Sequence, residues 1–461
     1  MSQHETRPSH PFTPRASSWL TRASTLLPLR AKDAFIHSKL ARNINAARLY
    51  FKALVGSRAN AASLLCSAYG YSSSTFVDRR IISKLRGGGF PLEEEFWRPL
   101  VANFPRYRSL LKEQSVLTRS IILKEPGAHG EKGVLLMCFE YNWARLAMAT
   151  HGQDFQWIDD NFDLILSTSW SPTDYLTLSL LLSKTKGPLF VQPCNRWETE
   201  KLARFHERII PVNSLPCDWI NPSFYASVPL AGRDIDILMV ANWGEFKRHW
   251  DFFNVLRQLP ANWRIVLVGQ KEGGRDAGFI AKLANKIGVP QSLEIHQSIP
   301  IAEVSALQQK ARVSLIFTRR EGCCVAAVES IFAGCAVGMR ADAHIGSLDY
   351  LNPSTGGSLR PGHLAEDILS LHAAASPETS SEWGRSHISC HHSLARLAEV
   401  LKAHAASRNL PWTRELRPVH WRPHPCHINE QDQSELSELH QECHRRYPDL
   451  FPVDLMDVSK Q

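Results

Sequence analysis

The sequence predicts an α/β protein with two Rossmann-like units, each a doubly wound parallel sheet covered by helices. Short apolar runs bounded by turn residues alternate with stretches of helical spacing in two successive blocks. A segment with prolines and a glycine, residues 221–234, separates the blocks. A chain of 461 residues is also too long for one ordinary core. If the two units face each other, the carboxyl ends of their strands line one central cleft, where ligands of such sheets bind.

The first block follows a basic N-terminal extension. Residues 1 to about 28 contain several prolines and are predicted to lack stable structure, and helical patterns continue to about residue 120. Buried strands are predicted at residues 133–140, 162–170, 187–193 and 208–213. We therefore expect an extension over residues 1–60 and an N-terminal Rossmann-like domain over residues 61–225.

The second block has the same alternation of strands and helices, with more regular spacing. Strands are predicted at residues 236–242, 263–269, 292–298, 312–318 and 335–339. Helices are predicted at residues 250–259, 277–287, 302–311 and 324–333, followed by a long helical pattern over residues 380–405. We expect a C-terminal Rossmann-like domain over residues 226–405 and a tail with a short helix over residues 406–461.

Positive charge is concentrated near the N-terminus. The net charge is +8, and between Arg15 and Arg58 there are nine Lys or Arg residues and one acid, Asp33. The segment is interpreted as a surface that meets anionic lipid, as a solvated helical extension, or as an organelle transit peptide. Nucleic-acid binding is not expected, because no reader motif accompanies the charge.

Membrane-spanning, secreted and metal-binding classes receive no support from the sequence. No apolar run reaches the ~18 residues that a transmembrane helix needs, and no secretory signal is visible. The ten cysteines lack framework spacing, which indicates reduced thiols in a cytoplasmic protein. The spacing of the C-terminal histidines and cysteines matches no familiar zinc finger, so we expect no metal; these residues are Cys426, His427, His440, Cys443 and His444.

Two carboxylates flank an apolar helix start in "EGCCVAAVESIFAGCAVG", residues 321–338. Glu329 lies inside the predicted helix, where a buried carboxylate needs a partner. No Ser, Thr, Asp or Asn stands at Gly322 or Cys323 to cap the helix. The uncapped amides there form an anion site at the positive end of the helix dipole; they belong to Cys323, Cys324 and Val325.

Basic residues occur at a comparable place after the first strand of the same block. Lys247 and Arg248 follow the strand at residues 236–242. Because the carboxyl ends of parallel strands meet at one edge of the sheet, we expect these cations to lie near the helix start at Cys324. Together they would hold a diphosphate without a metal.

These residues carry a resemblance to a known family. The stretch at residues 321–338 resembles the E-x7-E signature of retaining glycosyltransferases of family 4, which have the GT-B fold. The matching positions are Glu321, Gly322, Glu329, Gly334 and Val337. Lys247 falls on the family's lysine after a strand, and Gly269 falls on its strand-ending glycine. The resemblance covers residues 234–362; the first block is similar only in strand order.

The resemblance implies a role for each matched residue. Lys247 would bind the donor diphosphate, Glu321 the hydroxyls of the donor sugar, and Glu329 the ribose, with the amides after Gly322 near phosphate or sugar. The chain departs from the family at Asn242, where an arginine is usual, and at Cys324, where a glycine is usual. Arg248, Arg319 or Arg320 would then supply the missing cation.

The expected function is a retaining transfer of a hexose from a nucleotide-sugar donor to a glycan or lipid-linked acceptor. Glu140, Asn142 and Trp170 stand at strand ends of the first block and are acceptor-binding candidates. No cofactor beyond the donor is expected, and the protein would be cytoplasmic, with peripheral contact to an anionic membrane through its basic segment. A nucleotide-sugar epimerase of the same fold and a non-catalytic nucleotide-sugar-binding protein are the alternatives.

Overall fold

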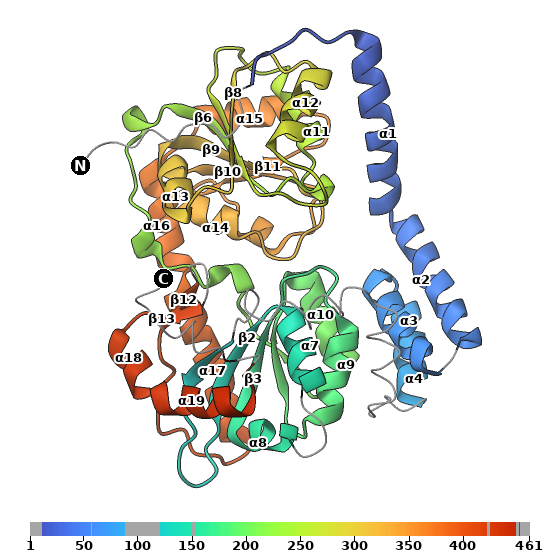
Figure 1. Cartoon of the computed structure of the whole chain (residues 1–461), viewed down its shortest axis with the longest axis vertical. Coiled ribbons are helices and arrows are strands. Elements are labelled where there is room, and N and C mark those ends of the chain that lie inside the picture. Colours follow the sequence, from blue (N-terminus) through green and yellow to red (C-terminus); the bar gives the residue numbers. More distant parts are fainter. Residues whose placement is uncertain are drawn as a thin grey trace. The chain divides into compact units, whose positions relative to one another are not determined.

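The computed structural model describes residues 12–56, 58–87, 120–149, 154–421, 425–448 and 451. The chain forms two compact units (Figure 1). Unit 1 contains Met1–His37 and Ile220–Ser389, and unit 2 contains Ser38–Trp219 and Cys390–Gln461. The chain passes from one unit to the other after residues 37, 219 and 389. These positions differ from the expected boundaries at residues 225 and 405, and they split the N-terminal extension between both units.

Unit 1 is built on a parallel sheet with the strand order of a Rossmann fold. The order is β11-β10-β9-β6-β7-β8, and each neighbouring pair is parallel. Successive strands are added on one side of β6 up to β8, and β9 then begins the other side of the sheet. The carboxyl ends of β6 and β9 are therefore the topological switch point. The strands are β6 (Ile235–Val240), β7 (Ile265–Gly269), β8 (Leu293–Gln297), β9 (Ala311–Ile316), β10 (Ala336–Arg340) and β11 (Gly356–Leu359).

Helices cover both faces of this sheet. Alternate strand residues point to opposite faces: Ile237 and Met239 join one apolar cluster, and Leu238 joins the other. The helices are α1 (Trp19–His37), α11 (His249–Leu256), α12 (Ala277–Ile287), α13 (Ile301–Lys310), α14 (Val325–Phe332), α15 (Leu364–Ala373) and α16 (Pro377–His387). Short 3-10 turns are η2 (Pro222–Phe224), η3 (Leu230–Gly232), η4 (Glu245–Lys247) and η5 (Gly346–Tyr350). The second block is thus found as predicted, with β11 as an additional edge strand that its four residues were too short to reveal.

The N-terminal segment is more ordered than its prolines predicted. Helix α1 begins at Trp19 and includes Pro28, so the expectation of no stable structure to about residue 28 is wrong from Trp19 onward. Leu26 is buried in the core of unit 1, and the side chain of Ser17 hydrogen-bonds the Lys286 carbonyl at 2.5 Å. Burial against α12 therefore stabilises a helix that its composition alone does not favour.

Unit 2 contains a five-stranded sheet in the order β1-β2-β3-β4-β5. Strands β2 to β5 are parallel and follow the chain without the reversal seen in unit 1, and β1 pairs antiparallel with β2. The strands are β1 (Ser120–Lys124), β2 (Gly133–Cys138), β3 (Phe162–Ser167), β4 (Leu189–Gln192) and β5 (Ile209–Pro211). The four parallel strands match the predicted runs, whereas β1 was not predicted.

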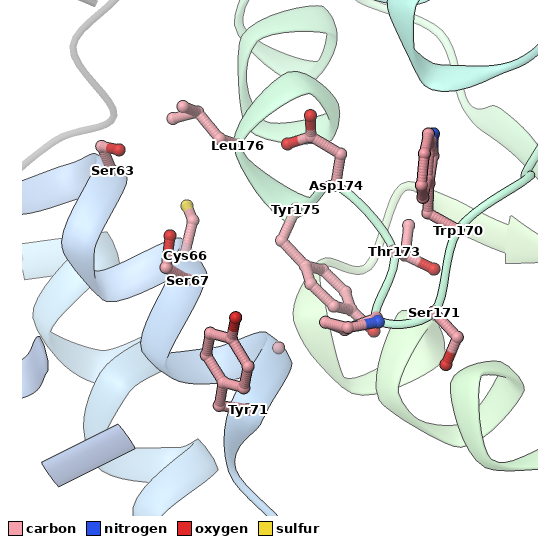
Figure 2. A pocket seen from close by; sticks show the side chains of 12 residues that line it. Ser63, Cys66, Ser67, Tyr71, Trp170, Ser171, Thr173, Asp174, Tyr175 and Leu176 are labelled. Carbon is pink, nitrogen blue, oxygen red and sulfur yellow. The ribbon is translucent and has the colours of Figure 1, made fainter. Parts of the chain in front are cut away.

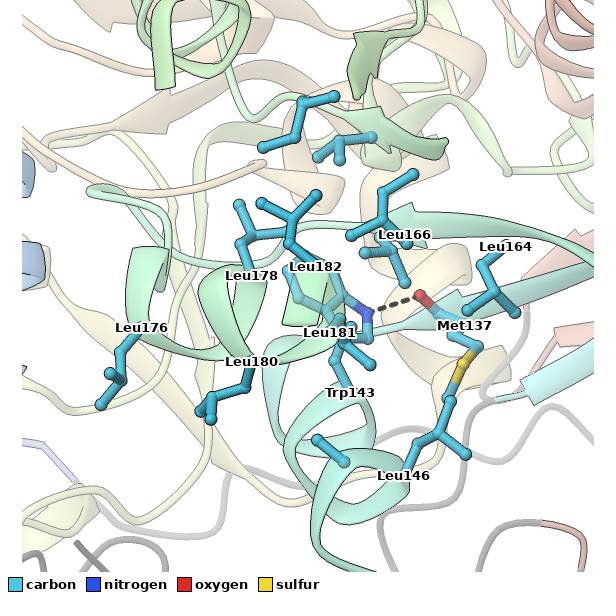
Figure 3. Packing of buried hydrophobic residues seen from close by; sticks show 14 of the residues in the cluster. Met137, Trp143, Leu146, Leu164, Leu166, Leu176, Leu178, Leu180, Leu181 and Leu182 are labelled. Atoms are coloured by element: carbon cyan, nitrogen blue, oxygen red, sulfur yellow. Dashed lines mark hydrogen bonds between the residues drawn. The ribbon is translucent and has the colours of Figure 1, made fainter. Parts of the chain in front are cut away.

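Different parts of the chain cover the two faces of the second sheet. Leu135 and Met137 face one cluster, in which the Trp143 indole donates a hydrogen bond of 2.9 Å to the Met137 carbonyl (Figure 3). Leu136 faces the other cluster together with Leu397 from near the C-terminus. The 3-10 turn η1 (Pro216–Asp218) follows β5, and the helices before and between the strands are α2 (Lys39–Val55), α3 (Arg58–Tyr71), α4 (Thr75–Gly87), α7 (Glu140–Ala149), α8 (Asp154–Asn161), α9 (Tyr175–Lys184) and α10 (Arg196–Phe205).

The long helical pattern at residues 380–405 is two helices in two different units. Helix α16 ends at His387, and α17 (Cys390–Ser407) begins after two linking residues. Ile388 has an extended backbone and is buried, so the helix cannot continue through it. The remaining elements belong to unit 2: β12 (Val419–Trp421), β13 (Pro425–His427), α18 (Glu430–Glu435) and α19 (Ser437–Arg446). Within the described residues, no helix combines the length and apolarity required to cross a bilayer.

Candidate active site

The switch point of unit 1 brings together residues that are far apart in the sequence. Strand β6 leads into η4, which ends at Lys247, and β9 leads through a loop to Glu321 and then to α14. Because β6 and β9 are neighbours, the segments that follow them share one edge of the sheet. The predicted meeting of Lys247 with the helix start at Cys324 is therefore a consequence of strand order.

Lys247 and Glu321 form an ion pair at this edge. The Lys247 ammonium contacts Glu321 Oε1, and both side chains are largely shielded from solvent. Burial is the largest single influence and would lower the pKa of Lys247, but the charge and hydrogen bond of Glu321, together with neighbouring groups, raise the pKa of the ammonium. The lysine is therefore a cation at neutral pH, held against one oxygen of the glutamate.

The second oxygen of Glu321 is buried and accepts no hydrogen bond from any described residue. The loop before it is held in place by the segment after β10: the His344 amide donates to the Arg319 carbonyl at 2.7 Å, and Arg320 bridges to His344. An ordered carboxylate with an unused, desolvated oxygen is costly unless a donor reaches it. A hydroxyl-bearing ligand would supply that donor.

Helix α14 begins as predicted, without a side-chain cap. Cys324 is the N-cap residue, and its side chain makes no capping hydrogen bond. Burial raises the pKa of its thiol to about 12, so Cys324 is a neutral, small side chain rather than a nucleophile. Gly322 is buried, and Cys323 and Val325 are partly exposed beside it. The first amides of α14 thus keep the positive end of the helix dipole near Glu321 and Lys247.

Glu329 is less buried than the sequence predicted. It lies on α14 at intermediate exposure, and Gln308 from α13 approaches its carboxylate at 3.4 Å. The same amide of Gln308 lies 3.4 Å from the Ser330 hydroxyl. Glu329 is therefore partly open to solvent and has the Gln308 amide nearby, so the charge is not fully buried.

Six charged side chains form a closed ring of alternating sign next to Lys247. Arg248 pairs with Asp33 and, at 2.7 Å, with Asp251. Arg340 continues the ring at 2.7 Å to Asp251 and 2.9 Å to Asp342. Arg319 closes it at 3.1 Å to Asp342 and 3.0 Å to Asp33. Asp33 comes from α1, so the single acid of the basic N-terminal segment completes the ring.

The ring changes the interpretation of the arginines. Arg248 and Arg319 were candidates for the missing phosphate cation, but three arginines and three aspartates sum to no net charge, and burial lowers the pKa of Arg248. Arg248 has left-handed backbone angles, with φ of 59°, and its guanidinium lies among acids. Lys247, which contacts Glu321, is a cation beside the uncapped helix, and Arg320 is outside the ring. No sequence pattern predicts this ring, because Asp33 and Arg340 are distant from Arg248 along the chain.

Asn242 and Gly269 support the turn that carries Lys247. The Asn242 side chain accepts a hydrogen bond of 3.1 Å from the Gly244 amide. A Cβ on Gly269 would lie 2.3 Å from the Ala241 carbonyl and 2.8 Å from the Trp243 ring. The glycine therefore makes room for the backbone before η4, and the Trp243 indole is fixed by a hydrogen bond of 3.0 Å to Gln297.

The acceptor candidates lie in unit 2 and hold a loop together. The buried carboxylate of Glu140 accepts hydrogen bonds of 3.1 Å from the amides of Ser169 and Trp170 and one of 2.5 Å from the Ser169 hydroxyl. Burial raises the pKa of Glu140 to about 7, although these hydrogen bonds favour the carboxylate. Asn142 is also buried and donates to the Cys138 carbonyl at 2.6 Å. Neither side chain is open to an acceptor, whereas Trp170 is half exposed.

Trp170 lines a cavity of about 290 Å³ in unit 2. Figure 2 shows the loop that follows Ser167 on one side of this cavity and helix α3 on the other, with Ser67 and Tyr71 pointing toward the loop. The Tyr175 hydroxyl behind the loop donates a hydrogen bond of 2.7 Å to Glu198. The cavity has polar and aromatic side chains but does not include Glu140 or Asn142.

No cluster of three or more His, Cys, Asp or Glu side chains in the described part of the chain is arranged to hold a metal ion. The C-terminal histidines named above include a pair, His427 and His440, whose rings lie 6.2 Å apart. Burial lowers the pKa of each to about 4, so both are neutral at pH 7.

Comparisons with known proteins give distant likenesses. No protein-family model and no curated protein matches the chain. Among solved structures, sucrose-phosphate synthase from Thermosynechococcus elongatus is 15% identical with a TM-score of 0.44, covering 59% of this chain and 74% of that one. Anabaena HepE in complex with UDP and glucose is 12% identical with a TM-score of 0.44, covering 58% and 78%. A mutant of S. aureus TarM in complex with UDP is 12% identical with a TM-score of 0.41, covering 52% of this chain and 50% of TarM. At these values the likenesses carry no argument about activity, which is argued below from the residues of this chain.

Proposed function

We propose that the protein is a glycosyltransferase that binds a nucleotide-diphosphate sugar at the switch point of unit 1. The observation that carries the proposal is the Lys247–Glu321 pair, whose carboxylate keeps one buried oxygen without a hydrogen bond. A diphosphate and a sugar hydroxyl together offer each member of the pair an alternative partner. The resemblance of residues 321–338 to the E-x7-E signature supports the same assignment.

Donor binding is then an exchange of partners. Lys247 turns from Glu321 to the diphosphate, and Glu321 accepts hydrogen bonds from sugar hydroxyls through both oxygens. No side chain caps the start of α14, so its first amides would donate to the phosphate. Glu329, one turn further along α14, accepts the hydroxyls of the ribose in place of water. These side chains and amides are already held near one another before the donor binds. Binding therefore costs less conformational entropy than if they had to be ordered first.

The transfer step breaks the bond between the anomeric carbon and the diphosphate oxygen, and the electron pair leaves with the diphosphate. The oxygen of an acceptor hydroxyl forms the new bond to that carbon, and its proton passes to the leaving diphosphate oxygen. Lys247 and the α14 amides stabilise the charge that grows on the leaving diphosphate. We propose a glycan or lipid-linked acceptor and retention of the anomeric configuration, as the E-x7-E resemblance implies.

Incubation with a panel of labelled nucleotide sugars tests the proposal. Transfer to an added glycan, or slow release of free sugar, is the expected result, and Lys247→Met and Glu321→Gln should each reduce it by about a hundredfold or more. An epimerised donor as the sole product would indicate the epimerase alternative. Binding without turnover would indicate a non-catalytic protein, and full activity in both variants would rule out this site.

Chelation tests the role given to Lys247 and the α14 amides. Because these groups offset the diphosphate charge without a metal, transfer should continue at an undiminished rate after treatment with EDTA. The measurement is the initial rate of labelled sugar transfer before and after dialysis against the chelator. A loss that added Mg²⁺ restores would contradict the charge balance proposed here.

A further inference from the structure

Helix α2 has apolar side chains on its outward face as well as on its inward face. Ala53 is buried in the core cluster of unit 2, and Leu49 and Tyr50 pack against that cluster. The opposite face carries Leu40, which is 72% exposed, and Val55 at 88%. The outward face of a helix in a water-soluble domain is usually polar, so large exposed apolar side chains indicate a partner.

The exposed residues of α2 form one continuous stripe. They are spaced by three, four and seven positions, which places them on one side of a helix; they are Leu40, Ile44, Ala47, Phe51, Leu54 and Val55. Figure 1 shows α2 beside α3, and the contacts between these two helices fix the face that is turned inward. The stripe therefore points away from unit 2.

Basic side chains border the stripe along one side. At ~100° per residue, Arg48 and Lys52 lie along this edge, and both are exposed. Helix α2 contains no Asp or Glu. Long cationic side chains at the edge of an apolar stripe can place their charged ends at the lipid phosphates. Their aliphatic portions stay in contact with apolar surface.

Helix α1 has the same arrangement in the preceding segment of the chain. Its inward face holds Leu26 and Asp33, whereas Leu20, Leu27 and Phe35 are each more than 60% exposed on the outward face. Arg30 is exposed near the edge of that face. Two successive helices, each in a different unit, thus carry an outward apolar stripe bordered by positive charge.

We propose that the outward stripes of α2 and α1 bind the surface of an anionic phospholipid membrane. The apolar side chains enter the boundary between headgroups and acyl chains, and the flanking cations contact lipid phosphates. This inference concerns where the protein acts and does not depend on the sugar chemistry proposed for unit 1. The partner is a lipid surface because the stripe is apolar, has Arg48 and Lys52 along one edge, and lies on a helix without acidic residues.

Sedimentation of the full chain with vesicles tests the inference. Binding is expected to vesicles of phosphatidylcholine mixed with phosphatidylglycerol, to be weaker without phosphatidylglycerol, and to decrease as salt is raised. The double variant Phe51→Ser/Leu54→Ser should bind at least about tenfold more weakly, because both side chains would leave apolar lipid. The matched control Phe279→Ser/Leu369→Ser changes exposed residues of α12 and α15 and should bind like the wild type.

A second pair of variants separates the charge contribution from folding. Arg48→Gln/Lys52→Gln should weaken binding to the anionic vesicles by about thirtyfold, since each cation near such a surface contributes about 1 kcal/mol. Lys271→Gln/Lys282→Gln removes two exposed lysines elsewhere and should have no effect. Equal binding by wild type and Phe51→Ser/Leu54→Ser would overturn the inference. A dimer in solution that this double variant dissolves would also overturn it, by identifying the stripe as a contact between two copies of the chain.

Discussion

At the scale of single residues, the Lys247–Glu321 pair determines both stability and the proposed chemistry. Lys247→Met should lower the free energy of unfolding by about 1–3 kcal/mol, because it leaves a desolvated carboxylate without its partner. Adding Glu321→Gln should recover part of this loss, since the second change removes the unpaired charge. Chemical denaturation of the wild type, the two single variants and the double variant gives the unfolding free energies for a double-mutant cycle. Strict additivity of the two changes would show that the side chains do not interact in solution.

The Glu140 carboxyl predicts a pH dependence of stability in unit 2. Its pKa in the folded chain is about 7, above the ordinary value of 4.5, so the folded state holds a proton that the unfolded state releases. The stabilisation by the neutral form is present below pH ~4.5 and is lost as pH rises to ~7, up to about 3 kcal/mol.

Glu140→Gln imitates the neutral carboxyl and isolates this effect. The difference in unfolding free energy between the variant and the wild type should shift in favour of the variant as pH rises through that window. Denaturant unfolding of both proteins at a series of pH values measures it. A difference that stays constant with pH would mean that the hydrogen bonds from Ser169 and Trp170 keep the carboxylate ionised throughout.

At the scale of elements, α1 contributes two adjacent residues to the surroundings of η4 with very different burial. Asp33 completes the charged ring with Arg248 and Arg319, whereas Lys32 pairs with the exposed Glu245 at 2.6 Å. Asp33→Asn should therefore cost about 1–3 kcal/mol, because Arg248 stays buried with less compensation. Lys32→Gln is the control and should cost less than about 1 kcal/mol. Thermal unfolding of the two variants measures these losses of stability. Equal losses would contradict a larger contribution of the charged ring than of the exposed pair.

The sequence predicts the parallel strands and the uncapped start of α14 well, because both depend on local patterns. It does not predict the partners of Arg248, because Asp33 lies more than two hundred residues earlier and ion pairs leave no periodic trace. The short edge strands β1 and β11 were missed for a related reason, since four or five residues show little alternation. Glu329 was expected to be buried, because helical spacing indicates a face but not how closely a neighbour packs on it.

At the scale of the whole molecule, unit 1 depends on a helix from the far end of the chain. A protein lacking residues 1–37 loses the burial of Leu26 and the acid that closes the ring. Its melting temperature should fall by roughly 2–4 °C for each kcal/mol of lost stability. A synthetic peptide of residues 12–37 should restore part of the loss, and the same peptide with Asp33→Asn should restore less. No change on deletion would show that α1 does not stabilise unit 1.

The three crossings between units also set an order on synthesis. Helix α1 is made before unit 2, but the rest of its own unit begins only at Ile220. Unit 2 is made next, up to Trp219, and still lacks α17, which covers the second face of its sheet. Unit 1 is complete only at Ser389, and unit 2 only after the segment that begins at Cys390. Domains usually fold one after another as they emerge, whereas here each unit must wait for a later part of the chain.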